Sequence, residues 1–174
     1  MKVMGLQEPG YWLCWLIYYF SISTIIAGLC TLLLTWKVLP LTSGPLLFFF
    51  FWLYGLSHFG YILLMHSLFS SPRTASILAT LAFFLTSFLD RLVSSTTPLP
   101  EWQRTLASLL PTISMSRGLQ NIIAFEKGLK GMQTANVGTV YYGHRVSTSM
   151  WMFQVSMLLM GMMGAAIMWL STKF

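Results

Sequence analysis

The stretch that decides the fold class is residues 11–34, YWLCWLIYYFSISTIIAGLCTLLL. It lies within a longer segment, between Glu8 and Lys37, that contains no charged residue. A helix needs about 20 predominantly apolar residues to cross the hydrocarbon core of a bilayer, because each residue adds about 1.5 Å of length. Residues 11–34 are therefore predicted to form a first membrane-spanning helix.

The composition of the whole chain agrees with this prediction. Of 174 residues, 56% are hydrophobic and only 8% are charged, whereas average soluble domains carry about 25% charged residues. So few charges cannot cover a globular surface, which excludes an ordinary cytosolic domain and an intrinsically disordered chain. The ten basic residues are scattered without a run, so we expect membrane lipids as partners and no nucleic acid. The sequence predicts an integral, multi-pass membrane protein.

Charges and turn residues divide the rest of the chain into three further spans, expected at residues 46–68, 74–90 and 150–170. The span at 74–90 is short and closes on Asp90 and Arg91, so it crosses only with help from flanking residues. The stretch 101–127 is predicted to form two short helices hinged at Pro111, either as a re-entrant hairpin or as an interfacial loop. The predicted fold class is all-α, with about four transmembrane helices and a short helical hairpin between the third and fourth.

Candidate chemistry is sparse. His58 and His66 lie eight residues apart, about 80° around a helix and two turns along it, which is poor geometry for a shared metal. We favour packed or water-contacting histidines, although ionisable groups inside a membrane also mark functional sites. The phosphate-binding, zinc-protease, C-x-x-C and G-x-S-x-G motifs are missing, and the sequence has only four acidic residues. We therefore expect no catalytic residue, metal, cofactor or enzyme activity in this chain.

Three stretches follow one another in a recognisable order: MKVMGL at 1–6 with the aromatic YWLCW at 11–15, LFSSPRTA at 68–75, and LASLLPT at 106–112 running on to AFE at 124–126. Together they resemble the A subfamily of ATP-binding cassette (ABC) transporters. In that family the first stretch enters a span after a cytoplasmic coupling helix. The second resembles its tight turn between two spans, and the third its outer-leaflet helical hairpin. The resemblance covers nearly the whole chain.

The resemblance implies ATP-driven movement of lipids or sterols across or out of a bilayer. Such transporters pair two membrane halves with two nucleotide-binding domains, so residues 1–174 would be part of one ABC-2-type transmembrane domain and are expected to be a fragment. A substrate path is expected near His58, Asp90 and Arg91. A contact with a coupling partner is expected at Met4, Gly5, Leu6 and Glu8.

A second hypothesis is a four-span membrane interaction subunit without transport activity of its own. It would assemble with other chains through the small residues of 161–166. The orientation in the membrane is also open to two interpretations. The resemblance implies that Met1 and Phe174 face the cytoplasm, whereas the six basic residues between positions 91 and 145 predict the reverse by the positive-inside rule. We follow the orientation of the family.

Overall fold

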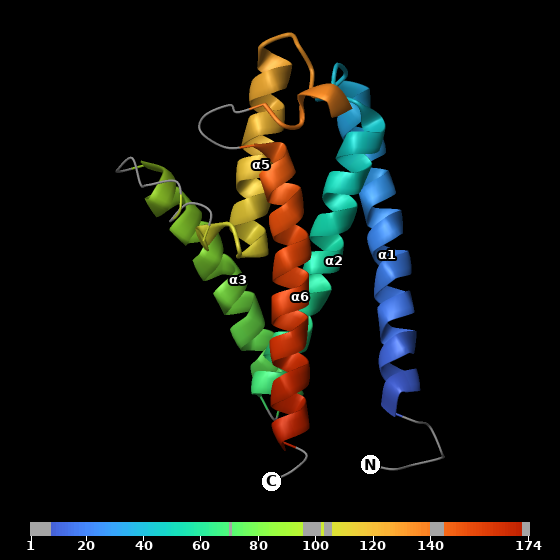
Figure 1. Ribbon diagram of the computed structural model, residues 1–174, viewed down its shortest axis with the longest axis vertical. Coiled ribbons are helices and arrows are strands. Elements are labelled where there is room, and N and C mark those ends of the chain that lie inside the picture. The colour runs from blue at the N-terminus through green and yellow to red at the C-terminus, as the bar shows by residue number, and fades with distance from the viewer. Residues whose placement is uncertain (1–7, 70, 96–101, 103–105, 140–144, 172–174) are drawn as a thin grey trace.

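A computed structural model describes residues 8–69, 71–95, 102, 106–139 and 145–171 of the protein. All regular structure within these residues is helical (Figure 1). The elements in chain order are α1 (Glu8–Lys37), α2 (Gly44–Leu68), α3 (Pro72–Ser95), α5 (Pro111–Lys127), the 3-10 helix η1 (Thr134–Asn136) and α6 (Val146–Ser171). The prediction of an all-α fold is confirmed.

Three of the described helices are long and apolar enough to cross a bilayer, namely Leu13–Lys37, Gly44–Leu68 and Val146–Ile167. The apolar part of α3, Arg73–Phe88, is shorter. The helix itself continues past residue 90, the predicted limit of the span, and ends at Ser95. The charged pair Asp90 and Arg91 does not interrupt it. The chain is thus a multi-pass integral membrane protein with three to four spans. That α3 crosses the whole bilayer stays a prediction.

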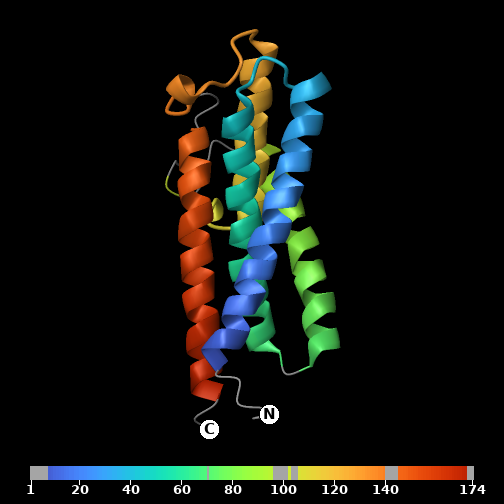
Figure 2. The same cartoon turned by 90° about the vertical axis from the view of Figure 1, so that its right-hand side faces the viewer.

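The long helices alternate in direction (Figures 1 and 2). α1 rises from the end where the N-terminus lies, and α2 returns beside it to that end, where a turn leads into α3. α6 descends along α2, so the start of α1 and the end of α6 lie at the same end of the molecule (Figure 1). The α1–α2 turn (38–43) and the segment 128–139 gather at the opposite end of the molecule, which we call the loop end (Figure 1).

Glycines allow α2 and α6 to approach closely. A Cβ added at Gly60 would lie 2.7 Å from the carbonyl oxygen of Met157, and one at Gly164 would lie 3.1 Å from the carbonyl carbon of Leu63. Lipid chains are as apolar as leucine, so membrane helices associate through close packing rather than through the hydrophobic effect. This backbone contact is therefore a principal source of stability for the α2–α6 pair.

α5 covers the second helix predicted for the hairpin. It begins at Pro111, the predicted hinge, because proline lacks an N–H and suits the first turn of a helix. α5 packs along α6 and α2 (Figure 1). The hydroxyl of Ser114 donates to the carbonyl oxygen of Ser149 at 3.2 Å. Of the stretch before this hinge, 101–110, which was predicted as the first hairpin helix, residues 101 and 103–105 lie outside the described residues, and residues 108–110 form a turn and not a helix.

Candidate functional site

His58 of α2 lies in an aromatic cluster between two helices. Its ring centroid is 5.1 Å from that of Tyr54, 5.9 Å from that of Tyr61 and 5.5 Å from that of Phe83 on α3. The Nδ1 atom of His58 is buried and makes no hydrogen bond within the described part of the chain. Buried polar atoms are nearly always paired, because an unpaired one costs free energy. Because ionisable residues inside a membrane span are rare, His58 is a candidate functional residue.

Two hydrogen bonds hold α3 beside this cluster. The hydroxyl of Tyr61 donates to the carbonyl oxygen of Ala79 at 2.9 Å. The hydroxyl of Thr112, at the start of α5, donates to the hydroxyl oxygen of Thr86 at 2.9 Å. Because Thr86 is three residues from Phe83, the start of α5 lies about one helical turn from the aromatic cluster. We call Tyr54, His58, Tyr61, Ala79 and Phe83 the α2–α3 seam.

The other residues predicted for the path lie further along α3. Asp90 and Arg91 belong to this helix, and Asp90 is seven residues beyond Phe83, or about 10 Å along the helix axis. The side chains of this pair fall outside the described residues, so the structure places only their backbone. Of the predicted coupling contacts, Glu8 is the first residue of α1. The remainder lie outside the described residues, and they are Met4, Gly5 and Leu6.

A polar cluster at the loop end was not predicted. One carboxylate oxygen of Glu126, on α5, accepts the backbone N–H of Leu41 at 2.8 Å, and the other accepts the hydroxyl of Thr42 at 2.6 Å. The Thr42 oxygen in turn accepts the N–H of Met132 at 3.3 Å. Beside it, Gly131 has a φ of +58° and its added Cβ would lie 2.2 Å from the Leu41 carbonyl oxygen, so the position requires glycine.

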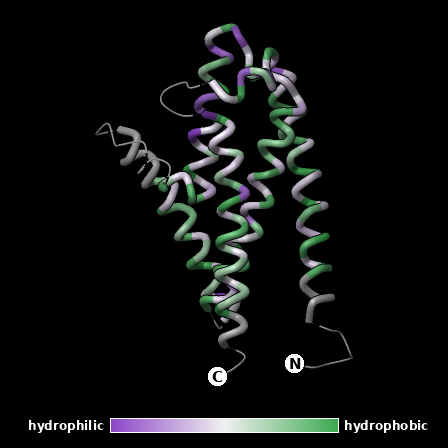
Figure 3. The backbone as a smooth tube through the Cα atoms, viewed as in Figure 1, coloured by the Kyte–Doolittle hydropathy of each residue, from purple (hydrophilic) through white to green (hydrophobic). Residues whose placement is uncertain are grey.

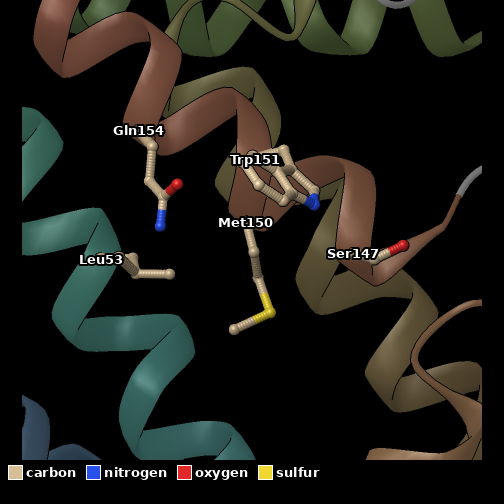
Figure 4. Close-up of a pocket in the computed structure, with 5 residues that line it drawn as sticks. All are labelled: Leu53, Ser147, Met150, Trp151 and Gln154. Atoms are coloured by element: carbon tan, nitrogen blue, oxygen red, sulfur yellow. The ribbon is translucent and has the colours of Figure 1, made fainter.

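A shallow groove of about 220 Å³ opens between α2 and α6 toward the loop end. Leu53 projects into it from α2, and the other lining residues come from α6 (Figure 4). They are Ser147, Met150, Trp151 and Gln154. Ligand pockets for drug-sized molecules enclose about 300–1,000 Å³. The groove is therefore too small to enclose a whole lipid.

The small residues of 161–166 divide between two faces of α6. Gly164 is buried against the backbone of α2, whereas a Cβ added at Gly161 would meet open space. Ala165 and Ala166 are exposed. Many exposed residues of α1 and α6 are large and hydrophobic, as expected of helices in contact with lipid, and hydrophobic residues recur along both helices in the hydropathy-coloured backbone (Figure 3). Among the described residues, no three His, Cys, Asp or Glu side chains lie together in a way that could hold a metal.

The sequence of this chain is similar to parts of known proteins. The chain is 29% identical over 143 residues to human ATP-binding cassette sub-family A member 6. The aligned residues make up 76% of this chain and 8% of that protein. It is 30% identical over 99 residues to the human cholesterol transporter ABCA5. Here the aligned residues make up 55% of this chain and 6% of that protein. Mouse ATP-binding cassette sub-family A member 17 is 23% identical over 147 residues, with 81% and 8% covered. The chain thus spans less than a tenth of the length of these relatives.

The match to a protein family covers more of this chain than the match to any of these relatives does. Residues 1–173 match the family described as ABC-2 family transporter protein. The match includes all the described helices, from α1 through the aromatic cluster of α2 and α3 to α6. The resemblance drawn from the three sequence stretches is confirmed. The chain belongs to the ABC-2 transporter family and contains its membrane domain.

Proposed function

We propose that this chain is the membrane-spanning part of an ATP-driven transporter that moves lipids or sterols across or out of the bilayer. The observation that carries the proposal is the match of residues 1–173 to the ABC-2 transporter family. The similarity to a protein named as a cholesterol transporter supports a lipid or sterol as the substrate class. Transport energy would come from ATP bound elsewhere, so no cofactor is proposed for these residues.

A nucleotide-binding domain and a second membrane half are the partners that this function requires. The membrane domain converts movement of its partners into movement of substrate, so it needs a contact at the end where α1 begins. We propose Met4, Gly5, Leu6 and Glu8 for that contact. The substrate path runs along α3, by way of His58, Asp90 and Arg91.

The position of α5 supports this assignment. α5 starts beside the apolar part of α3 and ends in the polar cluster of Glu126 at the loop end. A helix that begins among apolar residues and ends among polar ones fits the re-entrant alternative better than an interfacial loop. A re-entrant hairpin beside α3 would border a lipid path from within the membrane.

ATP-dependent lipid transfer tests the function. Vesicles would be prepared from source cells in which the gene is intact, deleted, or deleted and restored. Transfer of fluorescent sterol and phospholipid to acceptor vesicles would be followed with ATP and with a non-hydrolysable analogue. We expect deletion to abolish ATP-dependent transfer of at least one lipid, and restoration to recover it.

Two arginines of α3 provide a test variant and a matched control for the proposed substrate path. Arg91→Ala should lower transfer several-fold, whereas Arg73→Ala, at the exposed start of the helix, should leave it unchanged. Unaltered transfer of every lipid in the deletion strain would contradict the transport function. It would favour the interaction subunit instead, for which the half-buried Gly161 and the exposed Ala165 and Ala166 offer a contact surface.

A further inference from the structure

We infer that His58, assisted by Tyr54, is a docking point for the free hydroxyl group of a lipid with a rigid apolar body, the chemistry of a sterol. This inference rests on the proposed lipid transport and names the group that the site would recognise. It begins from the one buried side-chain nitrogen or oxygen that has no hydrogen-bond partner in the described part of the chain, Nδ1 of His58.

The position of Nδ1 makes an unpaired state costly. His58 lies within the apolar helix Gly44–Leu68, about 21 Å along the axis from its first residue. At that depth water is not available as a substitute partner, so an unpaired polar atom costs more than it would at a surface. In the neutral imidazole with its proton on Nε2, Nδ1 is an acceptor and requires a donor.

The neighbouring side chains are suited to a rigid apolar ligand. Tyr54, His58 and Tyr61 recur at spacings of four and three, which places them on one face of α2, and Phe83 faces them from α3. The hydroxyl of Tyr61 is already engaged with Ala79. The hydroxyl of Tyr54 makes no hydrogen bond with any described residue, so it adds a group that can both donate and accept.

Access to Nδ1 requires movement of an aromatic ring, because its neighbours cover it in this structure. In this proposal Phe83 is the ring that moves, because Tyr61 is held by its hydrogen bond to Ala79 and Tyr54 packs against Phe153 of α6. Phe83 is only partly buried, and α3 packs against α2 less extensively than α6 does. Outward rotation of Phe83 would open the α2–α3 seam toward the lipid beside α3, where Phe84 and Leu85 are exposed.

The chemistry of the site selects among lipid groups. A neutral hydroxyl can donate to Nδ1 without carrying charge into the span. The oxygens of a phosphate or carboxylate group are acceptors, so they cannot donate a hydrogen bond to Nδ1. Moving such a charged group out of water also costs free energy. A fatty-acyl ester has no donor at all. The site therefore favours a lipid whose polar end is an uncharged hydroxyl.

Photolabelling of the purified full chain in lipid nanodiscs tests this inference without ATP or partner subunits. The probes are a sterol with a diazirine in its ring system and a free 3-hydroxyl, and the 3-methyl ether of the same compound. His58→Phe keeps an aromatic ring but removes the acceptor, and His58→Asn restores an acceptor near the Nδ1 position. His66→Phe, on the exposed surface of the same helix, is the matched control.

We expect His58→Phe to lower labelling by the hydroxyl sterol about tenfold, as the loss of one buried hydrogen bond implies. His58→Asn should recover most of it, and His66→Phe should retain it. The methyl ether should label wild type and His58→Phe to the same low level. Equal labelling by the two probes in wild type would overturn the inference, as would full labelling of His58→Phe or competition by phosphatidylcholine.

Folding of each variant is checked by its melting temperature, and the His58→Asn variant keeps the test decisive if His58→Phe does not fold. In that case, equal labelling of His58→Asn by hydroxyl and ether probes would overturn the inference. Failure of this test leaves ATP-dependent lipid transfer untouched. Conversely, absence of ATP-dependent transfer with intact hydroxyl-selective labelling would contradict the proposed transport alone.

Discussion

Glu126 joins parts of the chain that are far apart in sequence. Its two oxygens accept hydrogen bonds from Leu41 and Thr42, which are 85 and 84 residues away. Hydrogen bonds to a charged group contribute about 1.5–3 kcal/mol each. Glu126→Gln removes the negative charge and replaces one acceptor oxygen by an amide donor, so the Thr42 hydroxyl no longer donates to a carboxylate and the contacts of residue 126 become weaker bonds between neutral groups. We expect this change to lower the unfolding free energy by about 1.5–3 kcal/mol, measured by thermal unfolding of the purified chain in detergent.

The neighbouring residue provides the control for charge alone. Lys127 ends α5, is exposed, and should tolerate Lys127→Gln with little change in melting temperature. A double-mutant cycle of Glu126→Gln with Thr42→Val should give a coupling energy of about 0.5–3 kcal/mol, because the two residues share one hydrogen bond. Strictly additive effects would show that Glu126 does not stabilise the loop end through Thr42.

Single residues also show how far the sequence could predict the candidate site. His58 was identified because an ionisable residue within an apolar span is conspicuous. Its partner Phe83 was not, since aromatic residues are common throughout this sequence. The role of Glu126 could not be predicted either, because periodicity reveals contacts within one helix and not contacts across 85 residues.

At the scale of helices, the α2–α6 contact depends on the missing side chain of Gly60. Gly60→Ala would place a Cβ 2.7 Å from the carbonyl oxygen of Met157, so the two backbones would have to separate. Overpacking of this kind lowers the stability by about 1–3 kcal/mol. The higher helix propensity of alanine offsets this loss by up to about 1 kcal/mol. We expect a net loss of stability, measured as a lower melting temperature in detergent.

Gly161→Ala is the matched substitution on α6. A Cβ there meets no atom within 4 Å, so the same gain in helix propensity comes without a clash. Its melting temperature should equal or exceed that of the wild type. Similar melting temperatures for the two variants would contradict the view that close backbone contact at Gly60 stabilises the helix pair.

The sequence predicted the helices well because charges and turn residues mark their limits. The uncharged interval between Glu8 and Lys37 corresponds to α1, and Ser71 with Pro72 marks the start of α3. The span predicted at 74–90 describes the apolar part of α3 only, because Asp90 and Arg91 follow that part without ending the helix, which continues to Ser95. The position of α5 beside α3 could not be predicted, because it follows from tertiary contacts such as that between Thr86 and Thr112.

At the scale of the whole molecule, the described residues place positive charge unequally at the two ends. At the loop end the structure describes four exposed basic residues, Lys37, Lys127, Lys130 and Arg145, whereas the turn between α2 and α3 carries Arg73. The positive-inside rule would place the loop end in the cytoplasm. The family resemblance places it outside. We expect the family orientation, because earlier spans of such a transporter insert first and usually set the topology.

Cysteine labelling decides between the two orientations. Cys14 and Cys30 are free thiols and would first be replaced by serine. Ala135→Cys then places one thiol at the exposed loop end, and Ser71→Cys places one at the exposed turn of the opposite end. On intact cells a membrane-impermeant maleimide should label Ala135→Cys but reach Ser71→Cys only after the membrane is opened. The reverse pattern would show that the basic loop segments control the topology, and would place the Glu126 cluster in the cytoplasm.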